Sequence, residues 1–228
     1  MMIRMVEREV ATKKGRVRLI REFDPGFIAG LHMGDGLGIF FHYRYEDAHK
    51  TKELLSTLCR SGGQRIACAV CSRDLVGYVT VVSTEPGSRW KVIEEALDGS
   101  AEGLQHPLLM ELGSIEISKP WRSLGLARQL LEFMFDDPYY EDRIVFSREL
   151  SWHWDLKASG LSAYEYRGML MRLFEGVGFR YCETDDEEIH YAGENMLMVR
   201  VGSAVPAETA LVFYRSVCRS EPRGWGWG

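Results

Sequence analysis

Hydrophobic and polar residues alternate in several short stretches of the chain, as they do in β-strands with one buried face. The stretch Gly15–Phe23 (GRVRLIREF) shows this alternation, and the apolar runs RIACAVC and LVGYVTVVS lie on either side of the turn residues Ser72–Asp74. Two such runs joined by a short polar turn predict a β-hairpin. Further strand-like stretches are Leu108–Ser118, Arg143–Trp152, GFRYCET and NMLMVRVG.

Apolar residues recur at helical spacing in other parts of the chain. The clearest stripe consists of Ala127, Leu130, Leu131, Met134 and Phe135, which fall at i, i+3, i+4, i+7 and i+8. Other expected helices are Tyr43–Arg60, Ser162–Phe174 and the run AETALVFYRSVCR. A hairpin followed by strand, helix, strand, helix and strand predicts an α/β domain, in which helices cover the faces of a mixed sheet.

Composition and charge narrow the class of protein. The chain has 228 residues, is 46% apolar and carries a net charge of −5, with no block of Lys and Arg. Phosphate recognition requires a basic surface, so no nucleic-acid partner is expected. No apolar run reaches the roughly 18 residues of a membrane-spanning helix, and the charged start of the chain lacks the apolar stretch of a signal peptide. We therefore expect a cytoplasmic protein with no membrane partner.

Cysteine usage argues against a metal site or a disulfide framework. Five cysteines are scattered along the chain, and Cys68 and Cys71 form a CxxC inside a predicted strand. No second cysteine or histidine pair completes a zinc site. Reduced thiols and no bound metal are the expectation.

The segment between Leu108–Ser118 and the clearest helix carries the strongest chemical signal. Its residues RSLGLA fit the pattern [RQ]-x-x-G-x-[GA] between a strand and an amphipathic helix. The first N–H groups of a helix have no partner within the helix and lie at the positive end of its dipole, so they can bind a phosphate. Gly125 and Ala127 leave room for such a group, and Arg122 and Arg128 add charge. A turn that simply needs a small residue explains the pattern equally well.

The wider sequence resembles the GNAT N-acetyltransferases. IEISKPWRSLGLARQLL resembles their acyl-CoA binding motif, and the hairpin before it and RLFEGVGF after it occur in the order of that superfamily. SWHWDLKASGLSAYEYRGML, ELGSIEIS and ENMLMVRVG resemble the acetoin-utilisation acetyltransferases of the AcuA type. The resemblance implies a mixed, mostly antiparallel central sheet with helices on both faces. It covers residues 15–202, after an N-terminal segment at 1–14 and before a C-terminal helix and tail at 203–228.

The resemblance also implies an activity, which is acetylation of a protein lysine with acetyl-CoA as cosubstrate. The implied protein substrate is acetyl-CoA synthetase, which acetylation switches off. Ile117 would bind the pantetheine and thioester through its backbone. The residues implied to bind the pyrophosphate are Arg122, Ser123, Leu124, Gly125, Leu126, Ala127 and Arg128.

Two carboxylates compete for the role of general base. Glu111 lies eleven residues before Arg122, a spacing that resembles the catalytic glutamate of histone-type lysine acetyltransferases, whereas Glu116 adjoins the expected thioester site at Ile117. In a regular strand the two side chains face opposite sides of the sheet, so at most one faces the acceptor. Either could instead be a solvated or salt-bridged strand residue. Both are retained as candidates.

Two further features bear on the site. Trp152, His153, Trp154 and Asp155 form a dense aromatic and polar block that the AcuA resemblance assigns to substrate binding, although tryptophans packing the end of a strand would look similar. Phe174 stands where many GNAT enzymes have a general-acid tyrosine, so no acid is assigned. The acidic run TDDEEIH could attract a basic partner, but a solvated turn is the favoured interpretation.

Two other functions remain compatible with the residues. One is N-acetylation of a small amine, which a narrow pocket beside Glu111 and Glu116 would favour. The other is a non-catalytic acyl-CoA sensor, for which Phe174 is the best support.

Overall fold

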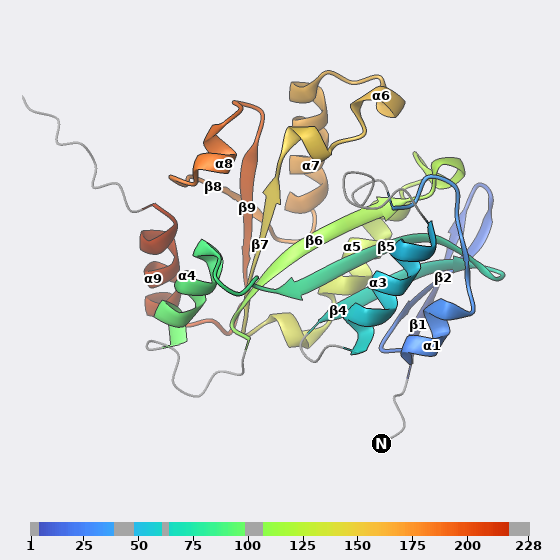
Figure 1. Ribbon diagram of the computed structural model, residues 1–228, viewed down its shortest axis with the longest axis horizontal. Helices are drawn as coiled ribbons and strands as arrows, with labels where there is room; N and C mark the ends of the chain where they lie inside the picture. The colour runs from blue at the N-terminus through green and yellow to red at the C-terminus, as the bar shows by residue number, and fades with distance from the viewer. Residues whose placement is uncertain (1–4, 39–47, 61–63, 99–106, 219–228) are drawn as a thin grey trace, which may run out of the picture. The chain divides into compact units, whose positions relative to one another are not determined.

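The computed structural model describes residues 5–38, 48–60, 64–98 and 107–218. The chain divides into two compact units (Figure 1). Unit 1 consists of Met1–Ser83 and Glu111–Pro138, and unit 2 consists of Thr84–Met110 and Tyr139–Gly228. Among the described residues, no helix has both the length and the apolar character needed to cross a bilayer.

Unit 1 is built on a mostly antiparallel sheet. Its strands, in spatial order, are β1 (Val6–Thr12), β2 (Gly15–Arg21), β4 (Arg65–Cys71), β5 (Asp74–Ser83) and β6 (Leu109–Ile117, in this unit from Glu111). The backbone N–H of Ser118 donates to the Val76 carbonyl at 2.9 Å, and the hydroxyls of Thr80 and Ser114 are 2.8 Å apart, so β5 and β6 are antiparallel. A short parallel strand, β3 (His32–Met33), also pairs with β5.

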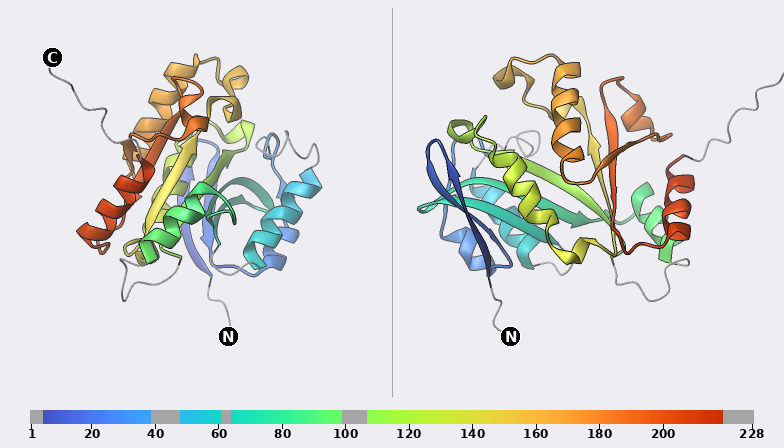
Figure 2. Two further views of the ribbon diagram at one scale, coloured as in Figure 1. Left: turned by 60° about the vertical axis from the view of Figure 1, so that its left-hand side comes forward. Right: turned by 180° about the vertical axis from the view of Figure 1, so that it is seen from behind.

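Helices cover both faces of the unit 1 sheet (Figure 2). On one face lie α1 (Pro25–Ala29) and α3 (Ala48–Arg60), whose buried residues Ile28 and Leu55 share a core with Tyr78 of β5. On the other lies α5 (Leu126–Phe135), which contacts β1, β2, β4 and β5. The predicted stripe is on its buried side, because Leu130, Leu131, Met134 and Phe135 are all buried.

Unit 2 contains a second antiparallel arrangement, in which β7 (Ile144–Glu149) pairs with β9 (Met196–Val201), and β9 pairs with β8 (Arg180–Cys182). Helices α4 (Arg89–Asp98) and α9 (Ala207–Val217) contribute to a core that includes Trp90, Phe146 and Phe213. The Trp90 and Phe146 rings stack with centroids 4.0 Å apart. Helix α7 (Ala163–Glu175) packs against β8 and β9, and two short helices, α6 (Leu156–Ser159) and α8 (Glu187–His190), complete the unit.

The fold class is α/β with a mixed, mostly antiparallel sheet, as predicted, and the hairpin of β4 and β5 is present. The strand predicted over Arg143–Trp152 is shorter, because β7 ends at Glu149 and Ser151–His153 forms a 3₁₀ turn. Val6–Thr12 is a strand that pairs with β2 along its whole length. Of the helix expected over Tyr43–Arg60, residues 43–47 lie outside the described residues, as does the tail at 219–228.

Candidate functional site

The turn between β6 and α5 has the backbone geometry of an open helix N-terminus. Gly125 is the N-cap residue, with a φ of 75° in the left-handed region and no side-chain hydrogen bond that caps the helix. A Cβ at Gly125 would have only Gln129 Nε2 within 4 Å, at 3.8 Å. Glycine is therefore required here by its positive φ rather than by crowding.

The first turn of α5 therefore has the properties of an anion site. The N–H groups of Leu126, Ala127 and Arg128 belong to the first helical turn, where backbone donors have no partner within the helix. The helix dipole adds partial positive charge at the same end. These residues fit a diphosphate group, because the turn offers backbone donors that no side chain caps.

The arginines of this turn are held by contacts within it. Arg122 Nε donates to the Ile117 carbonyl at 3.0 Å and closes the loop that follows β6. Arg128 lies on the exposed side of α5, where its Nε is 2.8 Å from Glu132 Oε1. Ser123 also has a positive φ, of 60°. Two of three consecutive residues, Ser123 and Gly125, thus turn the chain sharply just before α5 begins.

A glycine-rich loop at 34–38, with the sequence GDGLG, covers the end of β6. The N–H of Lys119 and the hydroxyl of Ser118 both donate to the Asp35 carbonyl, each at 2.9 Å. Gly34 donates to the Leu75 carbonyl at 2.9 Å, and a Cβ at Gly34 would lie 2.6 Å from that oxygen. The close approach of loop 34–38 to β5 and β6 thus depends on glycine.

Glu116 lies beneath this loop. The residue is 7% exposed, and its Oε2 accepts a hydrogen bond from the Gly38 N–H. Tyr78 is fully buried on the neighbouring strand, and burial together with the nearby Glu116 carboxylate raises the pKa of Tyr78 well above its usual value. The Tyr78 hydroxyl does not meet hydrogen-bond geometry with any partner among the described residues. Sequence reasoning missed Gly38 and Tyr78, and the alternating glycines of GDGLG were the available signal.

Glu111 is in a different environment on the same strand. It is half-buried, and it alternates with buried Met110 and Leu112 along β6. Because Glu111 and Glu116 are five residues apart, regular alternation puts them on opposite faces. Ile117 follows Glu116 directly in β6, so its side chain is on the opposite face of the sheet. On that face it lies against Gly77 of β5, where an added Cβ would be 2.7 Å from Ile117 Cδ1. The structure therefore separates the two candidate bases.

The aromatic and polar block falls in unit 2, directly after β7. Trp152 and His153 lie in the 3₁₀ turn, with ring centroids 5.9 Å apart, and Trp152 is exposed. Trp154 is buried, stacks on Tyr166 at 5.3 Å and donates from Nε1 to Glu149 Oε2 at 3.3 Å. Asp155 accepts from the Ala158 N–H and caps α6. Trp152 is therefore exposed and His153 is half-buried beside it, whereas Trp154 and Asp155 are engaged in local structure.

Phe174 is fully buried and packs against Phe179 with ring centroids 5.7 Å apart. A phenylalanine cannot donate a proton, so no acid is available from this position. Its burial at the end of α7 gives it a packing role.

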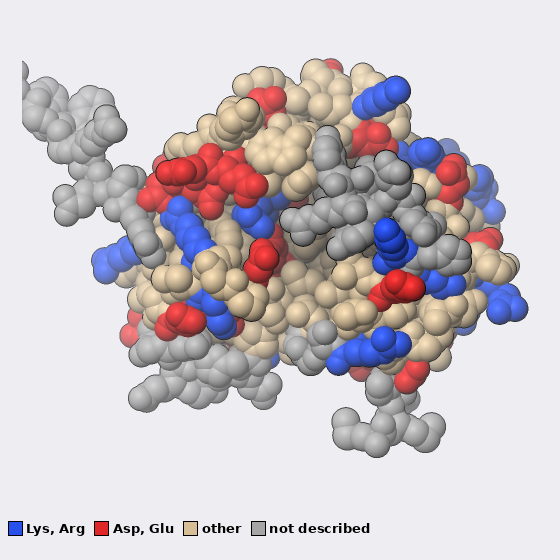
Figure 3. All heavy atoms as spheres, viewed as in Figure 1, with Lys and Arg blue, Asp and Glu red and all other residues tan. Residues whose placement is uncertain are grey.

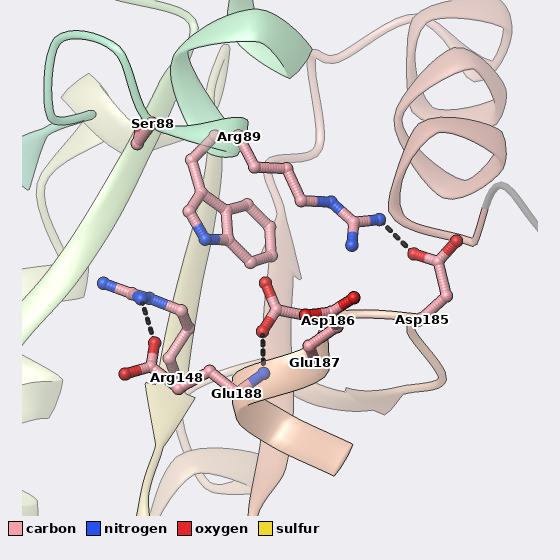
Figure 4. A pocket seen from close by; sticks show the side chains of 8 residues that line it. Ser88, Arg89, Arg148, Asp185, Asp186, Glu187 and Glu188 are labelled. Carbon is pink, nitrogen blue, oxygen red and sulfur yellow. Dashed lines mark hydrogen bonds and ion pairs between the residues drawn. The ribbon is translucent and has the colours of Figure 1, made fainter. Parts of the chain in front are cut away.

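The acidic run forms a short capped helix rather than a plain turn. Carboxylates gather over α8 on the surface of unit 2, with basic side chains beside them (Figure 3). Asp186 caps α8 by accepting from the N–H groups of Glu188 and Ile189. Asp185 pairs with Arg89, and Glu188 Oε2 is 2.8 Å from Arg148 Nη1 (Figure 4). A pocket of about 400 Å³ lies among these groups, lined by Ser88, Arg89, Trp90, Arg148, Asp185, Asp186, Glu187 and Glu188.

Comparisons with known proteins agree on one group. No family model matches the chain. The acetoin utilization protein AcuA of Bacillus licheniformis is 32% identical over 208 residues, which are 91% of this chain and 91% of that protein. The crystal structure of an acetoin utilization protein from Exiguobacterium sibiricum superposes with a TM-score of 0.82 and 28% identity, over 96% of each chain. The GNAT domain of S. lividans PAT shares the fold, with a TM-score of 0.50 and 10% identity, over 85% of this chain and 95% of that domain.

Proposed function

Because the chain belongs to the AcuA family of GNAT acetyltransferases, we propose that it transfers the acetyl group of acetyl-CoA to a lysine side chain of a protein. We further propose that acetyl-CoA synthetase is the protein substrate. The AcuA-like block SWHWDLK and the similarity to AcuA over nine-tenths of both chains support this choice over a small amine.

One observation carries the acetyl-CoA part of the proposal. The N-terminus of α5 is open, because Gly125 has a φ of 75° and no side chain caps the helix. Leu126, Ala127 and Arg128 would hold the diphosphate through their backbone N–H groups. Arg122 would keep the turn in shape through its 3.0 Å bond to the Ile117 carbonyl. Acetyl-CoA would supply the activated thioester.

The reaction requires removal of a proton from the acceptor. A lysine has an ordinary pKa near 10.4, so at neutral pH its amine is almost entirely protonated and cannot attack. After a base takes the proton, the amine nitrogen bonds to the thioester carbonyl carbon and the C–S bond breaks. The nitrogen loses a second proton as the amide forms, and coenzyme A leaves as a thiolate that takes up a proton. A thiolate is a good leaving group, which is compatible with Phe174 at the position of the usual acid.

We assign the base to Glu111 ahead of Glu116. The Glu116 carboxylate is 7% exposed and already accepts the Gly38 N–H, so it is poorly placed to exchange protons with an incoming lysine. Glu111 is half-buried and therefore retains access to solvent. In this assignment Glu116 has a structural role, in which it fixes loop 34–38 to β6.

The test mixes the protein with acetyl-CoA and purified acetyl-CoA synthetase, and locates acetyl-lysine by mass spectrometry. We expect one or a few modified lysines, and loss of synthetase activity that follows the modification. Glu111→Gln should lower kcat by about 10²- to 10⁴-fold, the usual contribution of a general base, with little change in acetyl-CoA affinity.

Glu116→Gln is the matched control. It should lower the melting temperature and leave kcat nearly unchanged. A large kcat loss for Glu116→Gln with normal activity for Glu111→Gln would reverse the assignment of the base. Acetylation of small amines with no mark on the synthetase would overturn the proposed substrate.

A further inference from the structure

An exposed aromatic pair lies beside the acidic helix of unit 2; the AcuA resemblance assigns one member, Trp152, to substrate binding, and the fold gives neither member a packing role. Trp152 is 37% exposed and Tyr191 is 82% exposed, and their ring centroids are 5.7 Å apart at an angle of 86°. With Glu187 and Glu188 they line a shallow depression of about 370 Å³, which we name the Trp152 pocket.

Large exposed aromatic side chains need an explanation when they cluster. A single exposed apolar residue is ordinary, whereas an exposed Trp and Tyr in contact offer a rigid apolar surface of the kind enriched at recognition sites. Trp154, two residues from Trp152, is buried and stacks on Tyr166. Packing at the end of β7 is therefore provided by Trp154, and Trp152 is left on the surface.

The charges around the pocket determine what it can bind. Of the four consecutive acidic residues, Asp185 pairs with Arg89, Asp186 caps α8 and Glu188 pairs with Arg148. Glu187 is exposed and forms no ion pair or hydrogen bond among the described residues. Of the two carboxylates that line the Trp152 pocket, Glu188 is thus paired and Glu187 is uncompensated.

A cation with an apolar stem matches this combination. The faces of Trp and Tyr attract ammonium and guanidinium groups through the ring quadrupole, and a carboxylate at the rim adds Coulomb attraction. The methylene chain of Lys or Arg packs on aromatic carbon while its charged end remains near water. Anionic ligands are disfavoured by the same carboxylates, and an uncharged aliphatic chain would leave Glu187 without a partner.

We propose that the Trp152 pocket is a docking site for a lysine or arginine side chain in a basic segment of the partner protein, apart from the lysine that is acetylated. This inference rests on the proposed function for the identity of the partner protein. What it adds is that the contact at the Trp152 pocket is made by a cationic side chain. The pocket sets affinity for the partner and takes no part in acetyl transfer.

Binding is tested without acetyl-CoA, so that the result does not depend on catalysis. The probe is a blocked peptide, acetyl-Gly-Gly-Lys-Gly-Arg-Gly-Gly-amide, and the control peptide has norleucine and citrulline in place of lysine and arginine. The readout is the indole N–H of Trp152 in ¹H–¹⁵N spectra, assigned with Trp152→Phe. We expect a saturable shift with the cationic peptide that weakens with added salt, and no shift with the control peptide.

Three substitutions locate the contact. Glu187→Gln and Tyr191→Ala should each weaken peptide binding by about twofold to fivefold, as expected for an exposed carboxylate or cation–π contact. Glu208→Gln is the matched control, because Glu208 is an exposed first-turn glutamate of α9, and it should bind normally. An equal shift with both peptides, or a shift that depends on protein concentration without peptide, would overturn the proposal and indicate an apolar site or self-association.

Activity provides an independent readout. With acetyl-CoA synthetase as substrate, Glu187→Gln should raise KM about twofold to fivefold and leave kcat unchanged, since an exposed carboxylate of this kind contributes under about 1 kcal/mol. A fall in kcat at constant KM would contradict a docking role. Absence of any acetylation would count against the proposed function. The peptide titration would still show whether the Trp152 pocket binds a cationic side chain.

Discussion

Gly125 combines a positive φ with a helix N-terminus that no side chain caps, and both follow from its missing side chain. A residue with a Cβ costs about 1–2 kcal/mol in the left-handed conformation, which Gly125 adopts at a φ of 75°. A serine or aspartate at a helix N-cap would occupy an N–H group with its own oxygen, and glycine leaves that donor available. Gly125 thus allows the positive φ of the turn and leaves the first backbone N–H groups of α5 without a side-chain cap.

Gly125→Ala should therefore affect stability and cofactor binding together. We expect a loss of about 1 kcal/mol in unfolding free energy from the strained φ. The Kd for acetyl-CoA should rise about tenfold, the equivalent of losing one charge-assisted hydrogen bond as the turn relaxes. Urea unfolding and calorimetric titration measure the two effects.

The control for that substitution is Gly87→Ala. Gly87 has a φ of 79°, and a Cβ at this position would have nothing within 4 Å, so the strain of the substitution is similar. Gly87 belongs to unit 2 and is not part of the turn before α5. The variant should lose similar stability and bind acetyl-CoA normally. Equal loss of binding in both variants would mean that the effect at Gly125 is only general destabilisation.

Tyr78 carries a buried polar group whose contribution to stability is open to direct measurement. Its hydroxyl is close enough to the Glu116 carboxylate for that group to raise the Tyr78 pKa, but it does not meet hydrogen-bond geometry with any described residue. A buried unsatisfied polar group costs about 1–3 kcal/mol. Tyr78→Phe should therefore keep the fold and raise the unfolding free energy by about 1 kcal/mol. If urea unfolding shows that Tyr78→Phe lowers the unfolding free energy by a similar amount, the hydroxyl donates a hydrogen bond to Glu116.

At the scale of elements, the sequence predicted the helices and strands whose apolar residues recur at a regular spacing. The stripe from Ala127 to Phe135 matches α5 almost residue for residue, and the β4–β5 hairpin was marked by two apolar runs. The strand β1 was missed because four of its seven residues are charged or exposed at the sheet edge, so it has no clear apolar face. Helix α8 was not predicted, because a helix of four residues is too short to show a repeating apolar pattern. Its N-terminus is instead stabilised by the Asp186 cap.

The segment that joins β9 to α9 in unit 2 is held by a carboxylate with a strongly lowered pKa. Hydrogen bonds from the hydroxyl and backbone N–H of Ser203, followed by Arg200, lower the pKa of Glu141 from its ordinary 4.5 to about 2. The Ser203 hydroxyl is 2.7 Å and its N–H 3.0 Å from Glu141 Oε2. Glu141 thus contributes stability above pH 4.5, and that contribution is lost as the pH falls from 4.5 towards 2.

Glu141→Gln tests this linkage. At neutral pH the variant should be less stable than the parent protein, and the difference should shrink as the pH falls below 4.5, because protonation removes the same charge from the parent. Urea unfolding at several pH values between 3 and 7 gives the two profiles, with Glu208→Gln as the exposed-glutamate control. Parallel profiles for Glu141→Gln and the parent would contradict the assignment.

At the scale of the whole molecule, the fold class and the family resemblance could be predicted, whereas the surroundings of the site residues could not. The motif RSLGLA is contiguous, so its position between β6 and α5 followed from the chain itself. The hydrogen bond from Gly38 to Glu116 joins residues 78 positions apart, and no local pattern encodes such a contact. The same holds for Trp152 and Tyr191, which meet only after the segments that carry them have folded.

Ligand binding should appear in the stability of the whole protein. A ligand that binds only the folded state at 100 times its Kd adds about 2.7 kcal/mol, which for a chain of this length corresponds to a rise in Tm of roughly 5–11 °C. We expect acetyl-CoA to give a rise of this size in a thermal melt. Acetyl-pantetheine has the same thioester and lacks the diphosphate and the 3′-phosphoadenosine, so at equal concentration it should give little or none.

The two ligands differ by the diphosphate and the 3′-phosphoadenosine, so a substitution in the turn before α5 is needed to separate the contribution of the diphosphate. Gly125→Ala should reduce the rise caused by acetyl-CoA and leave the response to acetyl-pantetheine unchanged. Equal stabilisation by the two ligands would mean that affinity comes from the acyl and pantetheine parts. In that case the open N-terminus of α5 would lose its role in binding, even if the protein still transferred acetyl groups.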